Sequence, residues 1–170
     1  MDQEWIDRLK IRELIDNWVL WRDANQWDRF RTVWHSDGRM MATWTQGTYE
    51  EFVEMSKQGF AKCVRILHFQ GPSTIDIQGP RAIAFTKMII SQRAKVHDVL
   101  VDVNCTGRFC DFIENRENRW GIVLRQPSTK RTAWTRSTRR RSSNWTPSAW
   151  LAFPKATGTW RICNRSSAIP

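Results

Sequence analysis

Three stretches in the first part of the chain place apolar residues at helical spacing. Residues 2–24 predict an amphipathic helix, because charged residues separate the apolar ones Ile11, Leu14, Ile15, Trp18 and Val19. Residues 26–35 predict a short second helix whose apolar face is Trp27, Phe30, Val33 and Trp34. A third helix is predicted over 48–63, where Thr48 and Glu51 have the spacing of a capping box.

After Cys63 the apolar residues alternate instead, which is typical of strands. Strands are predicted over 73–78, 81–92, 99–114 and 119–126, with a further short strand within 36–47. The connections between the long strands are short, so we expect an antiparallel meander. The predicted fold class is α+β: three N-terminal helices packed on a curved antiparallel sheet, forming a cone-shaped barrel around a pocket.

Charge divides the chain into two parts. The formal net charge is +10, but all 17 acidic residues precede residue 118. The charged residues of 126–170 are all Lys or Arg. The sequence therefore predicts a domain over 1–127 and an atypical, poorly ordered basic tail over 128–170. The segment STKRTAWTRSTRRRSS (128–143) shows this composition most clearly.

Two explanations of the tail stay open. Synonymous codons for residues 128–138 exist for which a shifted frame encodes YEKDRMDPVD, a segment of ordinary composition. We interpret the tail as the product of a one-base frameshift near codon 128, so nucleic-acid binding is not expected. The alternative is a genuine cationic arm, whose basic residues would contact phosphates and whose tryptophans would stack on bases.

Composition adds few constraints on location and redox state. No apolar run near the start has the length of a signal sequence or a membrane span, so we expect a cytoplasmic protein with no membrane association. The four cysteines form no CxxC pair and have no histidine at metal-ligand spacing. We expect reduced, mostly buried thiols and no metal site.

Three residues stand out by their placement as candidates for chemistry. Asp23 ends the first predicted helix, His68 stands at the start of the sheet region, and Arg125 lies in the last clear strand. Each also has a purely structural explanation: a helix-capping carboxylate, a buried histidine with satisfied hydrogen bonds, and a charge on an edge strand, respectively.

A resemblance to a known family favours the chemical interpretation. Four segments carry it, in this order: WRDANQWDRFRTVWHSDG (21–38), QGTYEEF (46–52), ILHFQG (66–71) and RWGIVLRQP (119–127). Together they resemble the SnoaL-like branch of the nuclear-transport-factor-2-like cone fold, and most closely its dehydrochlorinase, scytalone dehydratase and bile-acid dehydratase group. The resemblance covers about residues 3–127 and implies a catalytic dyad of Asp23 and His68, with Arg125 as the strand arginine.

The implied chemistry needs this set of side chains. A neutral imidazole removes a proton from carbon only if a carboxylate fixes its tautomer and stabilises its charged form. An arginine across the pocket then stabilises the developing anion. The resemblance thus implies a cofactor-independent lyase or isomerase that acts on a small apolar ring compound, and relatives of this kind form dimers or trimers.

One departure changes the expected pocket. The dehydrochlorinase has a lysine five residues before its aspartate, whereas this chain has Trp18. This argues against halide elimination and for an aromatic pocket wall, and we expect the substrate to contact Trp18, Met41, Tyr49 and Phe52. The alternative function is a non-catalytic protein that binds a small ligand in the same pocket, or nucleic-acid binding through the basic tail.

Overall fold

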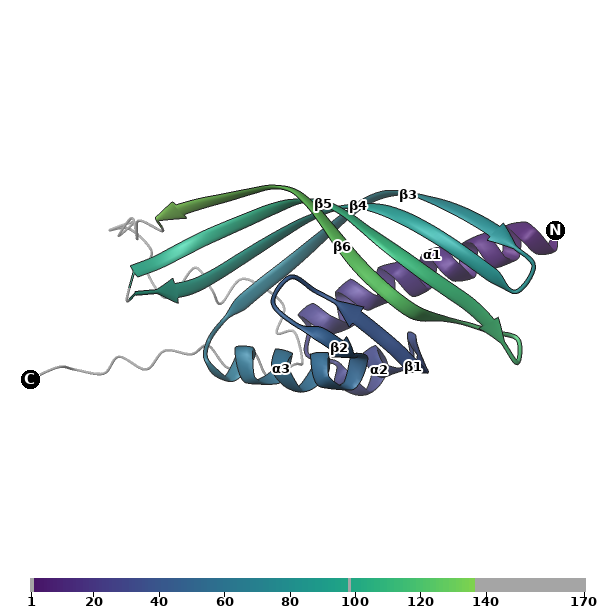
Figure 1. Cartoon of the computed structure of the whole chain (residues 1–170), viewed down its shortest axis with the longest axis horizontal. Coiled ribbons are helices and arrows are strands. Elements are labelled where there is room, and N and C mark those ends of the chain that lie inside the picture. The colour runs from purple at the N-terminus through teal and green to yellow at the C-terminus, as the bar shows by residue number, and fades with distance from the viewer. Residues whose placement is uncertain (1, 98, 137–170) are drawn as a thin grey trace, which may run out of the picture. The chain divides into compact units, whose positions relative to one another are not determined.

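The computed structural model describes residues 2–97 and 99–136. Its helices are α1 (Gln3–Asp23), α2 (Trp27–Arg31) and α3 (Tyr49–Ala61). Its strands are β1 (Trp34–Met41), β2 (Gln46–Thr48), β3 (Arg65–Gln78), β4 (Arg81–Val96), β5 (Val99–Arg116) and β6 (Arg119–Arg136). The predicted α+β class is confirmed: α1 lies beneath one half of the long curved strands β3 to β6, while α2 and α3 lie together with the short strands β1 and β2 below them (Figure 1).

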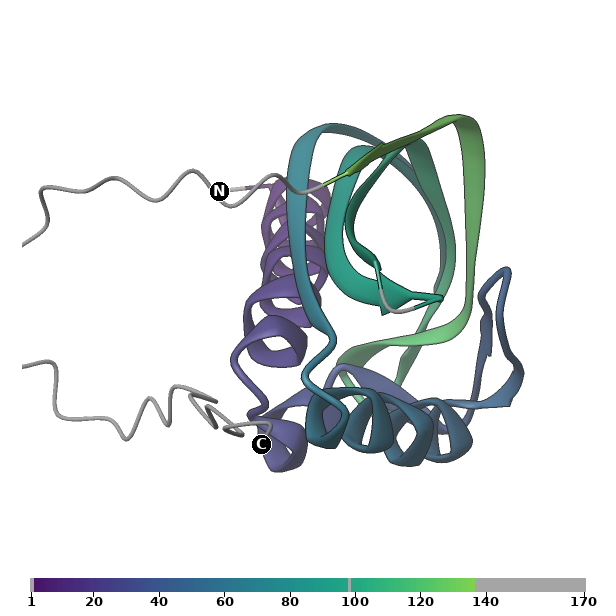
Figure 2. The same ribbon diagram turned by 90° about the vertical axis from the view of Figure 1, so that its left-hand side faces the viewer.

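The sheet has the strand order β2-β1-β6-β5-β4-β3. All described pairs are antiparallel except β1 with β6, which is parallel. Parallel strands need a long crossover rather than a tight turn. Here β2, α3 and the strands β3 to β5 lie in the chain between β1 and β6. Since β2 and β3 are edges in the described part of the chain, the sheet curves strongly but does not close into a barrel (Figure 2).

Helix α1 covers the free edge of β3. Its buried face includes Ile11, Ile15, Trp18 and Val19, as the sequence pattern predicts. On the neighbouring face, Arg8 donates to the carbonyl of Ile75, and Arg12 donates to the carbonyl of Gly71 at 3.0 Å. These side chains occupy acceptors that an edge strand otherwise leaves open to another chain. They also fix the N-terminal half of α1 against β3, and the helix then continues to Asp23.

The second predicted helix is too long. Helix α2 ends at Arg31, and Trp34 and His35 lie in β1. His35 is held by tertiary contacts, because its Nδ1 accepts from Arg119 and its Nε2 donates to the carbonyl of Glu114, both at 2.9 Å. The imidazole packs directly on Gly121, where a Cβ atom would come within 2.8 Å of the ring. Pairing with the β5–β6 hairpin thus overrides a sequence that reads locally as helix.

The predicted capping box of α3 is confirmed. Thr48 accepts from the backbone N–H of Glu51 at 3.2 Å, and the Glu51 carboxylate accepts from the backbone N–H of Thr48 at 2.7 Å. The helix buries Phe52, Val53 and Ser56 against the rest of the domain. Helix α3 therefore starts as the sequence indicates, but of the expected apolar face of Phe52, Met55 and Phe60 only Phe52 is fully buried, and Met55 is 40% exposed.

The predicted domain boundary at residue 127 falls inside β6. The strand continues to Arg136 and stays paired with β5, from Gly107 opposite Thr129 to Val101 opposite Arg136. Residues 128–136 thus belong to the sheet, since main-chain pairing needs no particular side chains. Residues 137–170, the greater part of the predicted tail, lie outside the described residues. The frameshift interpretation stays a prediction.

Candidate active site

Asp23 and His68 form a largely buried polar contact. The carboxylate of Asp23 accepts twice from one residue: from the His68 ring at Nδ1 (2.7 Å) and from the His68 backbone N–H (2.6 Å). The side chains are 13% and 6% exposed, respectively. Asp23 is the last residue of α1 and His68 lies near the start of β3. They meet because α1 packs along β3. Double acceptance fixes both the position of His68 and its ring orientation.

This geometry sets the tautomer of the imidazole. Because an ionised carboxylate only accepts, Nδ1 carries the hydrogen, and Nε2 then has the free lone pair. Burial lowers the pKa of His68, and this effect outweighs the opposing one of the Asp23 carboxylate. The nearby charges of Arg22 and Arg125 act in the same direction as burial. His68 is therefore a neutral base at neutral pH, oriented by its partner.

The lowered pKa predicts a pH dependence of stability. The unfolded chain binds a proton at His68 with a pKa of about 6.5, whereas the folded chain resists it. Stability is thus fully present above that value and is lost as the pH falls below it, by at most about 1.4 kcal/mol per pH unit. We expect the urea midpoint to fall between pH 7.5 and 5.5, and to fall less for His68→Gln. Equal falls in both proteins would contradict the assignment.

Arg125 lies fully buried beside the dyad. Its Nε and Nη2 donate to the two carboxylate oxygens of Asp111 at 2.6 and 2.7 Å, and both side chains are 0% exposed. Its Cζ lies 4.3 Å from the ring centroid of Trp18 and 4.6 Å from that of Phe109. Its Nη1 is buried and has no hydrogen-bond partner among the described residues. One end of the guanidinium is therefore anchored, and the other has unused donors.

The same two aromatic rings enclose His68. The ring centroids of Trp18 and His68 are 5.4 Å apart, and those of Phe109 and His68 are 6.1 Å apart. The Phe52 ring stacks on Trp18, with their centroids 6.0 Å apart. Of the four predicted substrate contacts, the structure thus places Trp18 against His68 and Phe52 against Trp18.

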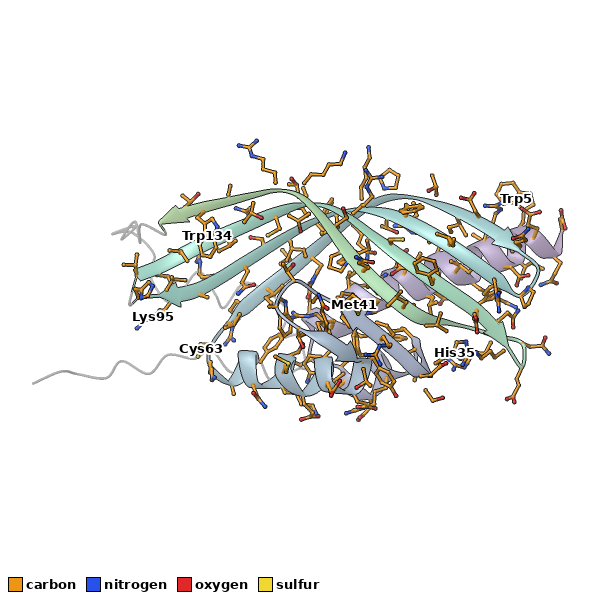
Figure 3. All side chains as sticks on the ribbon, viewed as in Figure 1. Trp5, His35, Met41, Cys63, Lys95 and Trp134 are labelled. Carbon is orange, nitrogen blue, oxygen red and sulfur yellow. The ribbon has the colours of Figure 1, made fainter. Side chains whose placement is uncertain are left out.

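The other two predicted contacts lie elsewhere. Tyr49 stacks on Trp34 at a centroid distance of 5.7 Å, and burial raises the pKa of its hydroxyl. Met41 ends β1, where it pairs with Gln46 of β2 (Figure 3). Neither residue is among those that contact His68 or line the cavity described next. Their proposed roles have no geometric support within the described part of the chain.

A cavity of about 630 Å³ opens next to the dyad. Arg22, the neighbour of Asp23, and Ile66, which shares a face of β3 with His68, are among its lining residues. Its remaining wall comes from the β1–β2 connection, the C-terminal half of α3 and the far ends of β4, β5 and β6, which include Trp134 (Figure 3). His68 is not among the lining residues of this cavity, and its ring packs on Trp18 and Phe109.

Comparison with known sequences settles the family. Residues 3–126 match the family model of the SnoaL-like domain. The chain belongs to this family. Two Fusarium vanettenii proteins are similar to this SnoaL-like chain: a PEP2-like protein, 37% identical over 126 residues, and Pea pathogenicity protein 2, 35% identical over 122. The matches cover 72% and 70% of this chain but only 54% and 52% of those proteins, so the chain spans about half their length.

Solved structures show the same fold. A type 2 hexachlorocyclohexane dehydrochlorinase superposes with a TM-score of 0.68 at 10% identity, covering 79% of this chain and 93% of that one. A putative scytalone dehydratase from Novosphingobium aromaticivorans gives 0.65 at 15% identity, covering 76% and 88%. At these identities the likeness shows the fold, which confirms the predicted SnoaL-like cone fold.

Several polar residues of this SnoaL-like site are absent from the sequence-based prediction. Asp111 holds Arg125, and its signal was available: it lies within an apolar strand, opposite Arg125 across a hairpin. Arg22, Ser56 and Gln70 also carry buried polar atoms that have no partner within the described residues. Gln70 shares a face of β3 with His68, two residues further along.

The described residues contain neither a metal-binding cluster nor a membrane-spanning helix. In the ranges 2–97 and 99–136, no group of His, Cys, Asp and Glu side chains could hold a metal ion. None of the helices in these ranges is long and apolar enough to cross a membrane.

Proposed function

We propose that this SnoaL-like domain is a cofactor-independent lyase or isomerase that removes a carbon-bound proton from a small ring compound. The observation that carries the proposal is the double acceptance by Asp23, which orients His68 and leaves Nε2 as the free basic nitrogen. This arrangement meets the requirements for carbon-acid chemistry: a neutral base, one tautomer and a carboxylate that stabilises the imidazolium.

The bonding changes of the proposed step are simple. The Nε2 lone pair of His68 takes the proton, and the electron pair of the broken C–H bond forms a carbon–carbon double bond. In an elimination, a leaving group on the next carbon departs with its bonding pair. In an isomerisation of a ring ketone, the π pair of the carbonyl moves onto its oxygen to give an enolate, and the protonated His68 returns the proton to another ring carbon. Either route develops negative charge on an oxygen or a leaving group.

Arg125 is the proposed donor to that charge. Its Nη1 has no partner in the described part of the protein, while Asp111 holds the rest of the guanidinium in place. Donors fixed before the reaction in a site that excludes water stabilise charge without reorganisation. Trp18 and Phe109 pack on both His68 and Arg125, so the surroundings of the dyad favour an apolar ring over a polar chain.

The proposal is supported by the dehydrochlorinase and the putative scytalone dehydratase that share the fold. A dehydrochlorinase and a dehydratase are both elimination enzymes. The expected dimer or trimer remains a proposal. The outer face of the sheet exposes large apolar side chains that self-association would cover: Leu67, Phe69, Ile83, Phe85, Ile89 and Phe112.

Hydrogen exchange tests the proposed chemistry without knowledge of the natural substrate. The protein is incubated in D₂O with a panel of ring ketones and β-hydroxy ring ketones, and mass spectrometry follows deuterium uptake and loss of water. We expect enzyme-dependent exchange at the carbon next to the carbonyl, or release of water, with at least one compound. If compounds bind but none exchanges or eliminates, the domain only binds ligands and the enzyme proposal is wrong.

A further inference from the structure

Arg22 is a buried cation whose nearest carboxylate is already occupied. Its side chain is 3% exposed, and its Nη1 lies 3.4 Å from Oδ1 of Asp23. That oxygen also accepts from Nδ1 of His68 at the much shorter distance of 2.7 Å, and Oδ2 accepts from the His68 backbone. Asp23 therefore compensates Arg22 only weakly, and Nε of Arg22 has no partner in the described ranges.

The buried Arg22 guanidinium destabilises the fold unless an anion binds to it. Burial lowers the pKa of Arg22 against the opposing effect of Asp23, which shows how poorly the charge is solvated. A buried charge without full compensation strongly destabilises a fold, and a ligand that supplies the counter-charge recovers that cost. Phe60, whose ring centroid lies 5.8 Å from Cζ of Arg22, shields the guanidinium but offers no hydrogen-bond acceptor.

The cavity of about 630 Å³ gives an anion access to this arginine. Ser56 lines the same cavity, and its hydroxyl is buried without a partner among the described residues. Lys62 adds a second cation, and none of the described residues that line the cavity is acidic. The potential in the cavity is thus positive, and unused donors come from both α1 and α3.

The rest of the cavity wall accepts an apolar body. Trp44 and Phe60 contribute aromatic surface, and Met55, Ile66 and Val103 contribute aliphatic surface. The volume is within the range of small-molecule sites, which hold ring compounds of one to three rings. A ligand that satisfies both surfaces is amphiphilic, with one anionic group and a compact ring body.

We propose that Arg22 and Ser56 form an anion-binding subsite for the carboxylate of a ring-containing organic acid. The apolar ring then lies against Trp44 and Phe60. The identification of this ligand as a substrate rests on the enzyme proposal. On that basis the substrate is a ring carboxylate, held by its acid group at the cavity wall beside the dyad. The subsite explains why a cation neighbours Asp23 at the end of α1, although Asp23 is needed to pair with His68.

The test compares two ligands that differ in charge but hardly in shape. The full-length chain is titrated calorimetrically with 2-naphthoate and with its neutral isostere 2-naphthamide. We expect the carboxylate to bind about 10- to 100-fold more tightly, as for a hydrogen-bonded buried charge pair. Arg22→Gln should remove this preference, and Ser56→Ala should reduce it several-fold. The Nε–H resonance of Arg22 should shift with naphthoate and not with naphthamide.

Arg65→Gln is the matched control. Its Cζ lies 5.9 Å from the same Phe60 ring, but Arg65 is exposed and does not line the cavity, so the preference should persist. Because the titration measures binding without turnover, its outcome is independent of the enzyme proposal. Equal affinities, no measurable binding of either ligand, or a preference that survives Arg22→Gln would each overturn the subsite. The resonance of Arg22 decides the question in the unmodified protein if Arg22→Gln does not fold.

Discussion

His68→Gln is expected to lower kcat/KM by about 10²- to 10⁴-fold for whichever ring compound the exchange assay identifies, the range that a positioned general base contributes. Glutamine retains hydrogen-bonding capacity at this position but has no basic nitrogen, so binding should change little. Asp23→Asn should cause a smaller loss, because an amide can hold the ring but does not stabilise the imidazolium. Steady-state kinetics of the three proteins would show the effect in kcat rather than KM.

His35→Gln is the control for this comparison. His35 is also buried, 3% exposed, but both of its ring nitrogens are occupied by Arg119 and Glu114. Its replacement should affect stability without a selective loss of kcat. A His68→Gln protein that remains folded and retains wild-type kcat would refute the proposed base, whatever the fate of the Arg22 subsite.

Local signals in the sequence were sufficient for α1, for the start of α3 and for the dyad candidates. Helix α1 has a clear apolar face, and the capping box of α3 needs only Thr48 and Glu51, three residues apart. Asp23 and His68 stand at element ends, where side chains from different elements can meet. Their hydrogen bond itself depends on how α1 lies along β3, which a family resemblance indicates and a single-sequence pattern does not.

Contacts between distant segments account for what the sequence did not predict. His35 reads as the end of a helix because its partners, Glu114 and Arg119, are far away in the chain. Residues 128–136 read as a tail because composition says nothing about main-chain pairing with β5. The sequence analysis did not single out Arg22, and only the three-dimensional structure shows that it is buried next to a carboxylate already in use.

Asp111→Asn is expected to destabilise the fold by about 3–5 kcal/mol, because it leaves the buried Arg125 guanidinium without its counter-charge. Both side chains are fully buried, so water cannot replace the lost carboxylate. The Arg93–Asp102 pair provides a matched control: it is also a cross-strand contact with two hydrogen bonds, at 2.6 and 2.8 Å, but its side chains are 55% and 27% exposed. Asp102→Asn should cost no more than about 1 kcal/mol. Urea unfolding monitored by circular dichroism gives both values.

The double variant Asp111→Leu/Arg125→Met separates stability from catalysis. Replacing both members of a buried ion pair by apolar residues of similar size is often neutral or stabilising, so the urea midpoint should return close to the wild-type value. Turnover should not return, because the Nη1 donors of Arg125 are gone from their place beside Trp18 and Phe109. A double variant with both wild-type stability and wild-type kcat would mean that Arg125 and Asp111 only support the core, and that the anion is stabilised by another group.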